Sequence, residues 1–121
     1  MKSFRDLEIW QEAHVLRMEI YRLSASFPFV EKYNLTSQIR RSSSSVADQI
    51  AESHGRYFYA DKVRVLYQSR GESEETRSQL SLAKDLNYIK SEKFDELEKR
   101  YESLGKRISS YISSLKKRKT N

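Results

Sequence analysis

The chain has 121 residues, enough for one domain with a modest core, and its three glycines and one proline argue against a fold of strands and tight turns. It has no cysteine, no apolar run near the ~20 residues of a membrane span and no apolar N-terminal stretch, so we expect a cytoplasmic protein with no membrane partner. The net charge of +6 suggests a polyanionic partner, although the basic residues of the C-terminus supply +4 of it: Lys116, Lys117, Arg118 and Lys119.

The first predicted helix runs from about Asp6 to Ser26, and Pro28 lies just beyond its end. Apolar residues recur in it at spacings of 3 and 4, as a core-facing stripe does: Ile9, Ala13, Leu16, Ile20, Leu23 and Phe27. A second stripe lies well round the same helix: Leu7, His14, Met18 and Tyr21. This second stripe predicts either a wide core face or an interface between subunits.

The stretch "QIRRSSSSVADQIAES" from Gln38 to Ser53 resembles a disordered linker because of its four consecutive serines. Its flanking apolar residues nevertheless recur at helical intervals: Leu35, Ile39, Val46 and Ile50. A disordered segment has no reason to keep that spacing. We therefore predict a second helix that contains the serines.

A third helix is predicted from about Asp61 to Leu86, with an inward stripe of small and apolar residues: Leu66, Ser69, Ser73, Thr76, Leu80 and Ala83. An antiparallel hairpin through "HGRYFY" would bring Ser42 and Ser43 level with Ser69 and Ser73. Small side chains on both helices predict a tight seam, with hydroxyls bonded back to the carbonyl four residues earlier. The alternative is that the Arg-Arg-Ser-Ser motif is a phosphorylation site.

The fourth predicted helix begins near Ser91 and has the clearest pattern, with apolar residues alternating 3 and 4 apart: Phe94, Leu97, Tyr101, Leu104, Ile108, Tyr111 and Leu115. Four amphipathic helices of about 20 residues with short connections favour an all-α fold, an antiparallel up-and-down four-helix bundle. We assign residues 1–115 to the bundle and residues 116–121 to a basic C-terminal tail.

The residues of catalytic and metal sites are scarce. The two histidines, His14 and His54, fall on different helices without a carboxylate at ligand spacing, and the Glu-x-x-His motif of di-iron bundles is absent. The serines lack a histidine base and a nucleophile elbow, and the sequence has no glycine-rich phosphate loop. We expect a protein that is not an enzyme and that uses no cofactor and no metal.

Binding is better supported. Basic residues cluster on the second and third helices: Arg40, Arg41, Arg56, Lys62, Arg64, Arg70 and Arg77. Together with the four basic residues of the tail they are candidates to bind nucleic-acid phosphates, while Tyr57, Phe58 and Tyr59 at the hairpin tip could stack on bases. The alternative is that these aromatic side chains plug the end of the bundle and that the arginines pair with nearby acids.

Five segments in order, "FRDLEIWQEAHVL", "IYRLSASFP", "YNLTSQIRRSSSSV", "QIAESHGR" and "SRGESEETRSQLSLAKDLNYI", resemble the proteins encoded by intervening sequences in bacterial 23S rRNA genes, also known as the S23 ribosomal protein family. The resemblance extends from about Phe4 to Leu115. It implies a four-helix bundle protomer, a homopentamer, and a relation to the accessory protein of diversity-generating retroelements, which binds a reverse transcriptase and nucleic acid. The word ribosomal refers to gene location, so we infer no ribosomal subunit.

Two functions remain open at this stage. The first is a non-enzymatic oligomer that binds RNA or DNA, structured RNA or an RNA–protein complex above all, through its basic surfaces. The alternative is a protein-interaction scaffold, such as an accessory subunit of a reverse transcriptase, with no nucleic-acid role of its own. Leu7, His14, Met18 and Tyr21 are the candidate oligomer interface in both cases.

Overall fold

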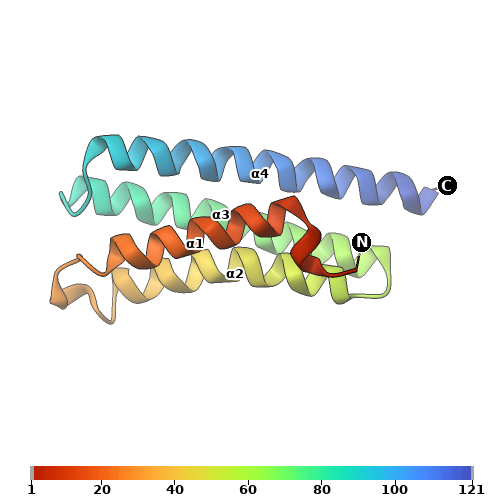
Figure 1. Ribbon diagram of the computed structural model, residues 1–121, viewed down its shortest axis with the longest axis horizontal. Coiled ribbons are helices and arrows are strands. Elements are labelled where there is room, and N and C mark those ends of the chain that lie inside the picture. The colour runs from red at the N-terminus through yellow and green to blue at the C-terminus, as the bar shows by residue number, and fades with distance from the viewer. Residues whose placement is uncertain (1, 121) are drawn as a thin grey trace.

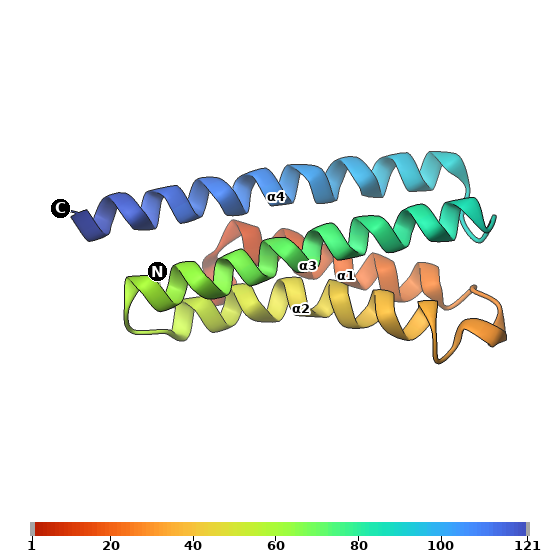
Figure 2. The same cartoon turned by 180° about the vertical axis from the view of Figure 1, so that it is seen from behind.

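The computed structural model describes residues 2–120, with side chains up to Arg118. Within that range the chain forms four α-helices and no strand: α1 (Glu8–Ser24), α2 (Leu35–Gly55), α3 (Tyr59–Asp85) and α4 (Ser91–Thr120). The helices lie side by side in alternating directions (Figure 1 and, from behind, Figure 2). The predicted all-α, antiparallel up-and-down four-helix bundle is therefore confirmed.

Each helix packs against two neighbours, and the contact between α2 and α3 is the most extensive. The predicted core stripes are buried on all four helices, except that Leu23, Phe94 and Tyr111 are only partly buried. The largest fully buried side chains include Leu16, Ile20, Ile39, Ile50, Leu66, Leu80, Leu97, Tyr101, Leu104 and Ile108. The charged residues lie on the outer faces, as expected for amphipathic helices. None of the helices in the described chain combines the length and apolar composition needed to cross a bilayer.

The first helix is shorter than predicted because the chain turns before it. Ser3 and Asp6 form a reciprocal capping box on a 3-10 turn, Phe4–Asp6, and Leu7 then takes an extended conformation as the N-cap of α1. Leu7 therefore lies outside the helical turns of α1. Its side chain is only 4% exposed and packs in the core. For Leu7 the structure supports a wide core face and contradicts its placement in the candidate oligomer interface, and helical spacing does not apply across an extended residue.

The predicted serine seam between α2 and α3 is confirmed, since Ser42, Ser43, Ser69 and Ser73 are all fully buried. The partners differ from those predicted. Ser42 Oγ donates to Gln79 Oε1 at 2.7 Å and lies 2.8 Å from Thr76 Oγ1. Side chains lean toward the N-terminus of their own helix, which shifts contacts across an antiparallel pair by about one turn.

Burial also decides between the seam and the phosphorylation site. Ser42 and Ser43, which directly follow Arg41, have no exposed surface. Ser69 Oγ donates across the seam to the carbonyl of Val46 at 2.8 Å, so the two backbones approach closely there. A kinase could not reach the first two serines of the run without separating α2 from α3.

The two ends of the bundle differ. The α1–α2 and α3–α4 connections lie at one end, where the Tyr88 hydroxyl donates to Glu31 Oε2 at 2.8 Å and ties them together. The α2–α3 connection lies at the other end, beside the start of α1 and the end of α4 (Figure 1). α4 continues to Thr120, so the basic residues after Leu115 prolong the helix, while Asn121 lies outside the described residues.

Candidate interaction surface

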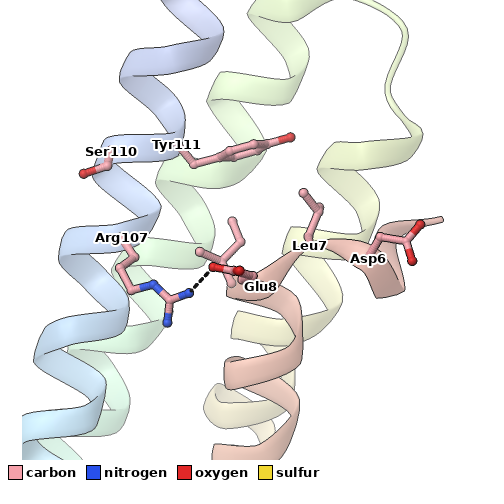
Figure 3. A pocket seen from close by; sticks show the side chains of 7 residues that line it. Asp6, Leu7, Glu8, Arg107, Ser110 and Tyr111 are labelled. Carbon is pink, nitrogen blue, oxygen red and sulfur yellow. Dashed lines mark hydrogen bonds and ion pairs between the residues drawn. The ribbon is translucent and has the colours of Figure 1, made fainter. Parts of the chain in front are cut away.

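A groove of about 420 Å³ lies between the start of α1 and α4. Figure 3 shows Arg107 and Tyr111 reaching from α4 toward Leu7 and Glu8. The Arg107 guanidinium and the Glu8 carboxylate form an ion pair at 3.2 Å across it. Asp6, on its rim, accepts from the backbone amides of residues 2 and 3. The charged groups of this groove, Arg107, Glu8 and Asp6, therefore already have partners within the chain.

The histidines do not form a site with other metal-binding side chains. His14 is half-buried, stacks on Trp10 with ring centroids 4.9 Å apart, and accepts a hydrogen bond from Arg17 Nε at Nδ1. His54 is half-buried in the last turns of α2. In the described part of the chain, no three His, Cys, Asp or Glu side chains gather in a way that could hold a metal ion.

Three of the seven predicted basic residues of α2 and α3 form ion pairs. Arg41 lies 3.1 Å from Glu72 and 2.6 Å from Glu75, and the hydrogen bond to Glu75 raises the pKa of Arg41. Arg56 pairs with the carboxylate one turn before it, and Arg77 pairs with three acids: Glu74, Glu98 and Glu102. These three arginines support the interpretation in which basic residues serve the bundle itself.

Two more predicted basic residues satisfy the ends of helices. Arg40 donates from Nε to Ser24 Oγ at 2.8 Å and from its terminal nitrogen to the carbonyl of Tyr21 at 3.1 Å, near the end of α1. Lys62 Nζ donates to the carbonyls of Ser53 and His54 at 3.3 and 3.0 Å, in the last turn of α2. Both cations bind carbonyl oxygens near the C-terminal end of a helix, where the helix dipole favours positive charge.

Four of the remaining predicted basic residues make no ion pair with a carboxylate that the structure describes: Arg64, Arg70, Lys116 and Arg118. Arg64 is exposed on the second turn of α3. Arg70 donates to Ser109 Oγ at 2.9 Å and lies over the ring of Tyr67, while Lys116 Nζ bonds the Tyr67 hydroxyl at 2.9 Å. Lys117 and Arg118 follow on the exposed end of α4, and the side chain of Lys119 lies outside the described residues.

Tyr67 was not among the residues predicted to bind nucleic acid, yet it contacts basic residues of two helices. Its ring is contacted by Arg70 from α3 at 4.8 Å and by Lys116 from α4 at 5.2 Å. The hydrogen bond with Lys116 lowers the pKa of Tyr67. Only the antiparallel pairing of the start of α3 with the end of α4 brings these side chains together.

The antiparallel pairing of α3 with α4 also concentrates positive charge at one end of the molecule. Residues 53–71 and 103–120 share one end of the α3–α4 pair (Figure 1) and carry ten basic and one acidic residue, a net +9. Residues 72–102, toward the α3–α4 turn, carry six basic and nine acidic residues, a net −3, and residues 1–52 carry seven of each. We define the basic end as Arg64, Arg70, Lys116, Lys117 and Arg118. Counting charges by half-helix would have revealed this polarity from the sequence.

The aromatic residues of the hairpin tip do not plug the bundle. Tyr57 is 87% exposed and Phe58 is 64% exposed, and their rings meet edge to face with centroids 4.9 Å apart. Tyr59 begins α3 and is partly exposed. The interpretation in which these rings close the end of the core was wrong for Tyr57 and Phe58, because a connection of only three residues, 56–58, leaves them beyond the last core layer.

The predicted second stripe of α1 still presents apolar surface to solvent, although Leu7 is buried. Met18 and Tyr21 are 40% and 42% exposed and line a shallow groove of about 250 Å³ with Arg17 and Ser44. Val15, which is 47% exposed, extends the apolar surface beyond the predicted residues. An apolar outer face of this kind is typical of association between proteins.

Comparisons with known proteins agree on the fold and on one family. The family model of the 23S rRNA-intervening sequence proteins matches residues 5–110. A crystal structure of a protein of unknown function, from the S23 ribosomal protein family of Bacteroides thetaiotaomicron, has a TM-score of 0.80 and 23% sequence identity, covering 87% of this chain and 95% of that chain. No curated protein matches the chain. At that identity the solved structure supports the fold alone.

Proposed function

The chain belongs to the family of 23S rRNA-intervening sequence proteins, and from this premise we propose that it is a non-enzymatic protein that binds RNA through the basic end. The family name gives the place of the genes and does not assign a ligand. The observation that supports binding is the segregation of charge, a net +9 at one end of the α3–α4 pair against −3 at the other. A polyanion would gain from such a surface.

The chemistry of the basic end suits phosphates. Arg64, Arg70 and Lys116 carry charges that no described carboxylate within 4 Å neutralises, so their positive potential extends into solvent. Binding by such groups releases counterions from the nucleic acid, and affinity should fall with salt by a log–log slope of roughly −0.7 per phosphate contacted on a single strand. The ion-paired Arg41, Arg56 and Arg77 should contribute little.

Two variants with the same loss of charge test the proposal. Replacing Arg64, Lys116 and Arg118 together by glutamine should weaken binding of a labelled RNA oligonucleotide at least tenfold at low salt, because each lost phosphate contact removes part of the electrostatic free energy. The matched control replaces three exposed cations away from the basic end, Arg22, Lys90 and Lys99, by glutamine. The control should retain most of the affinity.

Equal losses in the two variants would mean that net charge matters and its position does not. An absence of RNA binding by the wild-type chain at low salt would favour the second function, a scaffold for proteins. The exposed face of Val15, Met18 and Tyr21 favours association with another protein surface, a second copy of this chain first of all. A ring of five copies would gather five basic ends into one assembly.

A further inference from the structure

Exposed aromatic rings occur at both ends of the bundle, but the two sets have different surroundings. Tyr57 and Phe58 project at the α2–α3 tip, at the same end of the bundle as the start of α3 and the end of α4. Phe29 and Tyr33 are 82% and 80% exposed in the α1–α2 connection, within the part of the chain that carries no net charge. Only Tyr57 and Phe58 lie at the same end of the bundle as the strongly basic surface.

The tip is held in one arrangement by its own hydrogen bonds. The Arg56 amide donates to the carbonyl of Ser53 at 3.2 Å, and the Lys62 amide donates to that of Phe58 at 3.0 Å. The Lys62 ammonium also donates to the carbonyls of Ser53 and His54 in the last turn of α2. The backbone of such a short, bonded connection loses little conformational entropy when a ligand covers the rings.

We propose that the hairpin tip binds unpaired nucleotides, with one or two bases stacked on Tyr57 and Phe58 and the adjoining phosphates held by the basic end. The proposal rests on the RNA binding proposed above and specifies its ligand. Exposed aromatic rings stack on any base with a free face, and cations that follow the backbone complete the usual pattern of single-strand recognition. A duplex offers free base faces only at its termini.

The geometry of the two rings limits the site. Their planes meet at 84°, so a single base cannot lie flat on both. A separate base can stack on each ring, or one base can stack on one ring while the other ring lies at the edge of that base. Arg64 lies about two turns into α3, so a strand leaving the tip along α3 would pass this unpaired cation.

The test compares two double variants of the full-length chain. The tip variant carries Tyr57→Ala and Phe58→Ala, and the matched control carries Phe29→Ala and Tyr33→Ala, which also removes two exposed rings. Since all four rings are mostly exposed, both variants should melt within a few degrees of the wild type. The probes are an oligouridylate of about ten nucleotides, an abasic oligomer of the same length and a blunt RNA duplex of the same length.

We expect the tip variant to bind oligouridylate at least fivefold more weakly than wild type, since the bases lose the rings on which they stack. Its affinity for the abasic oligomer should stay within twofold, because that probe offers phosphates and no bases. The control variant should match wild type with every probe. Wild type should also prefer oligouridylate to the duplex.

Different failures separate the two proposals. Unchanged oligouridylate binding by the tip variant would overturn stacking and leave RNA binding by the basic end intact. Equal weakening with the oligouridylate and the abasic oligomer would also overturn it, because the rings would then act without bases. Wild type that binds no RNA probe at low salt would remove both proposals. Tip-dependent binding to anionic lipid vesicles, without RNA binding, would assign the tip to a membrane surface instead.

Discussion

Ser42 and Ser73 face the same seam and are both fully buried, but their hydroxyl groups differ in what they bond. Ser42 Oγ has two partners on α3, Thr76 and Gln79, besides the carbonyl of Ile39 in its own helix. Ser73 Oγ has no hydrogen-bond partner. A buried hydroxyl without a partner costs free energy, whereas a bonded one contributes modestly. The two serines should therefore respond in opposite ways to removal of the hydroxyl.

Ser73→Ala should leave the free energy of unfolding unchanged or raise it by up to about 1 kcal/mol, because it removes a desolvated group and keeps the seam narrow. Ser42→Ala is the matched control and should lower it by about 1–3 kcal/mol, because Gln79 Oε1 loses its donor. Denaturant unfolding of both variants measures the difference. A Ser73→Ala variant less stable than Ser42→Ala would show that Ser73 has a partner, such as an ordered water.

At the scale of the helices, α1 and α4 are joined in a different way from α2 and α3. Small side chains let α2 and α3 approach, whereas α1 and α4 are bridged by long charged side chains. Arg100 binds both Glu12 and Glu19, and Lys93 Nζ lies 3.0 Å from Glu19 Oε1. Partial burial raises the pKa of Glu19, but the hydrogen bonds and charges of Lys93 and Arg100 outweigh it, and the net pKa lies below the ordinary value of 4.5.

A carboxylate whose pKa is lowered by folding stabilises the fold above its unfolded pKa, and that stability disappears as the pH falls through the lower, folded pKa. Glu19 should therefore contribute fully above about pH 5 and progressively less below pH 4.5. Glu19→Gln should lower stability at pH 7 by about 1 kcal/mol, the upper range for partly exposed ion pairs, and flatten the loss on acidification. Thermal melts at several pH values measure both effects.

The control for this prediction is Asp95→Asn, an exposed position of α4 that forms no ion pair with the described residues. Its stability should follow the wild-type pH profile. If Glu19→Gln follows that profile as well, the α1–α4 bridge does not contribute to acid sensitivity. The acid-labile group would then lie elsewhere, with Glu75 as the next candidate, because its hydrogen bond with Arg41 lowers the pKa of Glu75.

The sequence predicted the helices and their buried stripes because both follow from local spacing, and the stripe of α4 shows this best. It could not predict the contacts between distant residues. The pairing of Arg41 with Glu72 and Glu75 spans more than 30 residues, so it depends on which helices are neighbours. The burial of Leu7 depends on an extended residue after a 3-10 turn, where helical periodicity fails.

At the scale of the whole molecule, two surfaces are exposed and suited to bind partners outside the chain. One is the basic end with the aromatic tip, and the other is the outer face of α1 with Val15, Met18 and Tyr21. The first suits RNA and the second suits a protein surface. They belong to different helices, so one surface could hold subunits together while the other binds a ligand.

Met18→Glu tests the second surface. A buried carboxylate without a partner would oppose association, so the variant should lose any oligomer while keeping its helical content. Light scattering should give a mass well above the 14.4 kDa of one chain for wild type, about 72 kDa for five copies, and a mass near one chain for the variant. A single-chain mass for wild type at micromolar concentration would exclude the ring. An oligomer that survives Met18→Glu would place the interface on another face.

The position of the RNA-binding surface is the central claim, and photo-crosslinking measures it most directly. An oligouridylate that contains 4-thiouridine would be crosslinked to the full-length chain at low salt, and the modified peptides mapped by mass spectrometry. We predict crosslinks within residues 56–70 and 106–118, which contain the basic end and the exposed rings of the tip. Crosslinks confined to residues 72–102, or to the outer face of α1, would contradict the account.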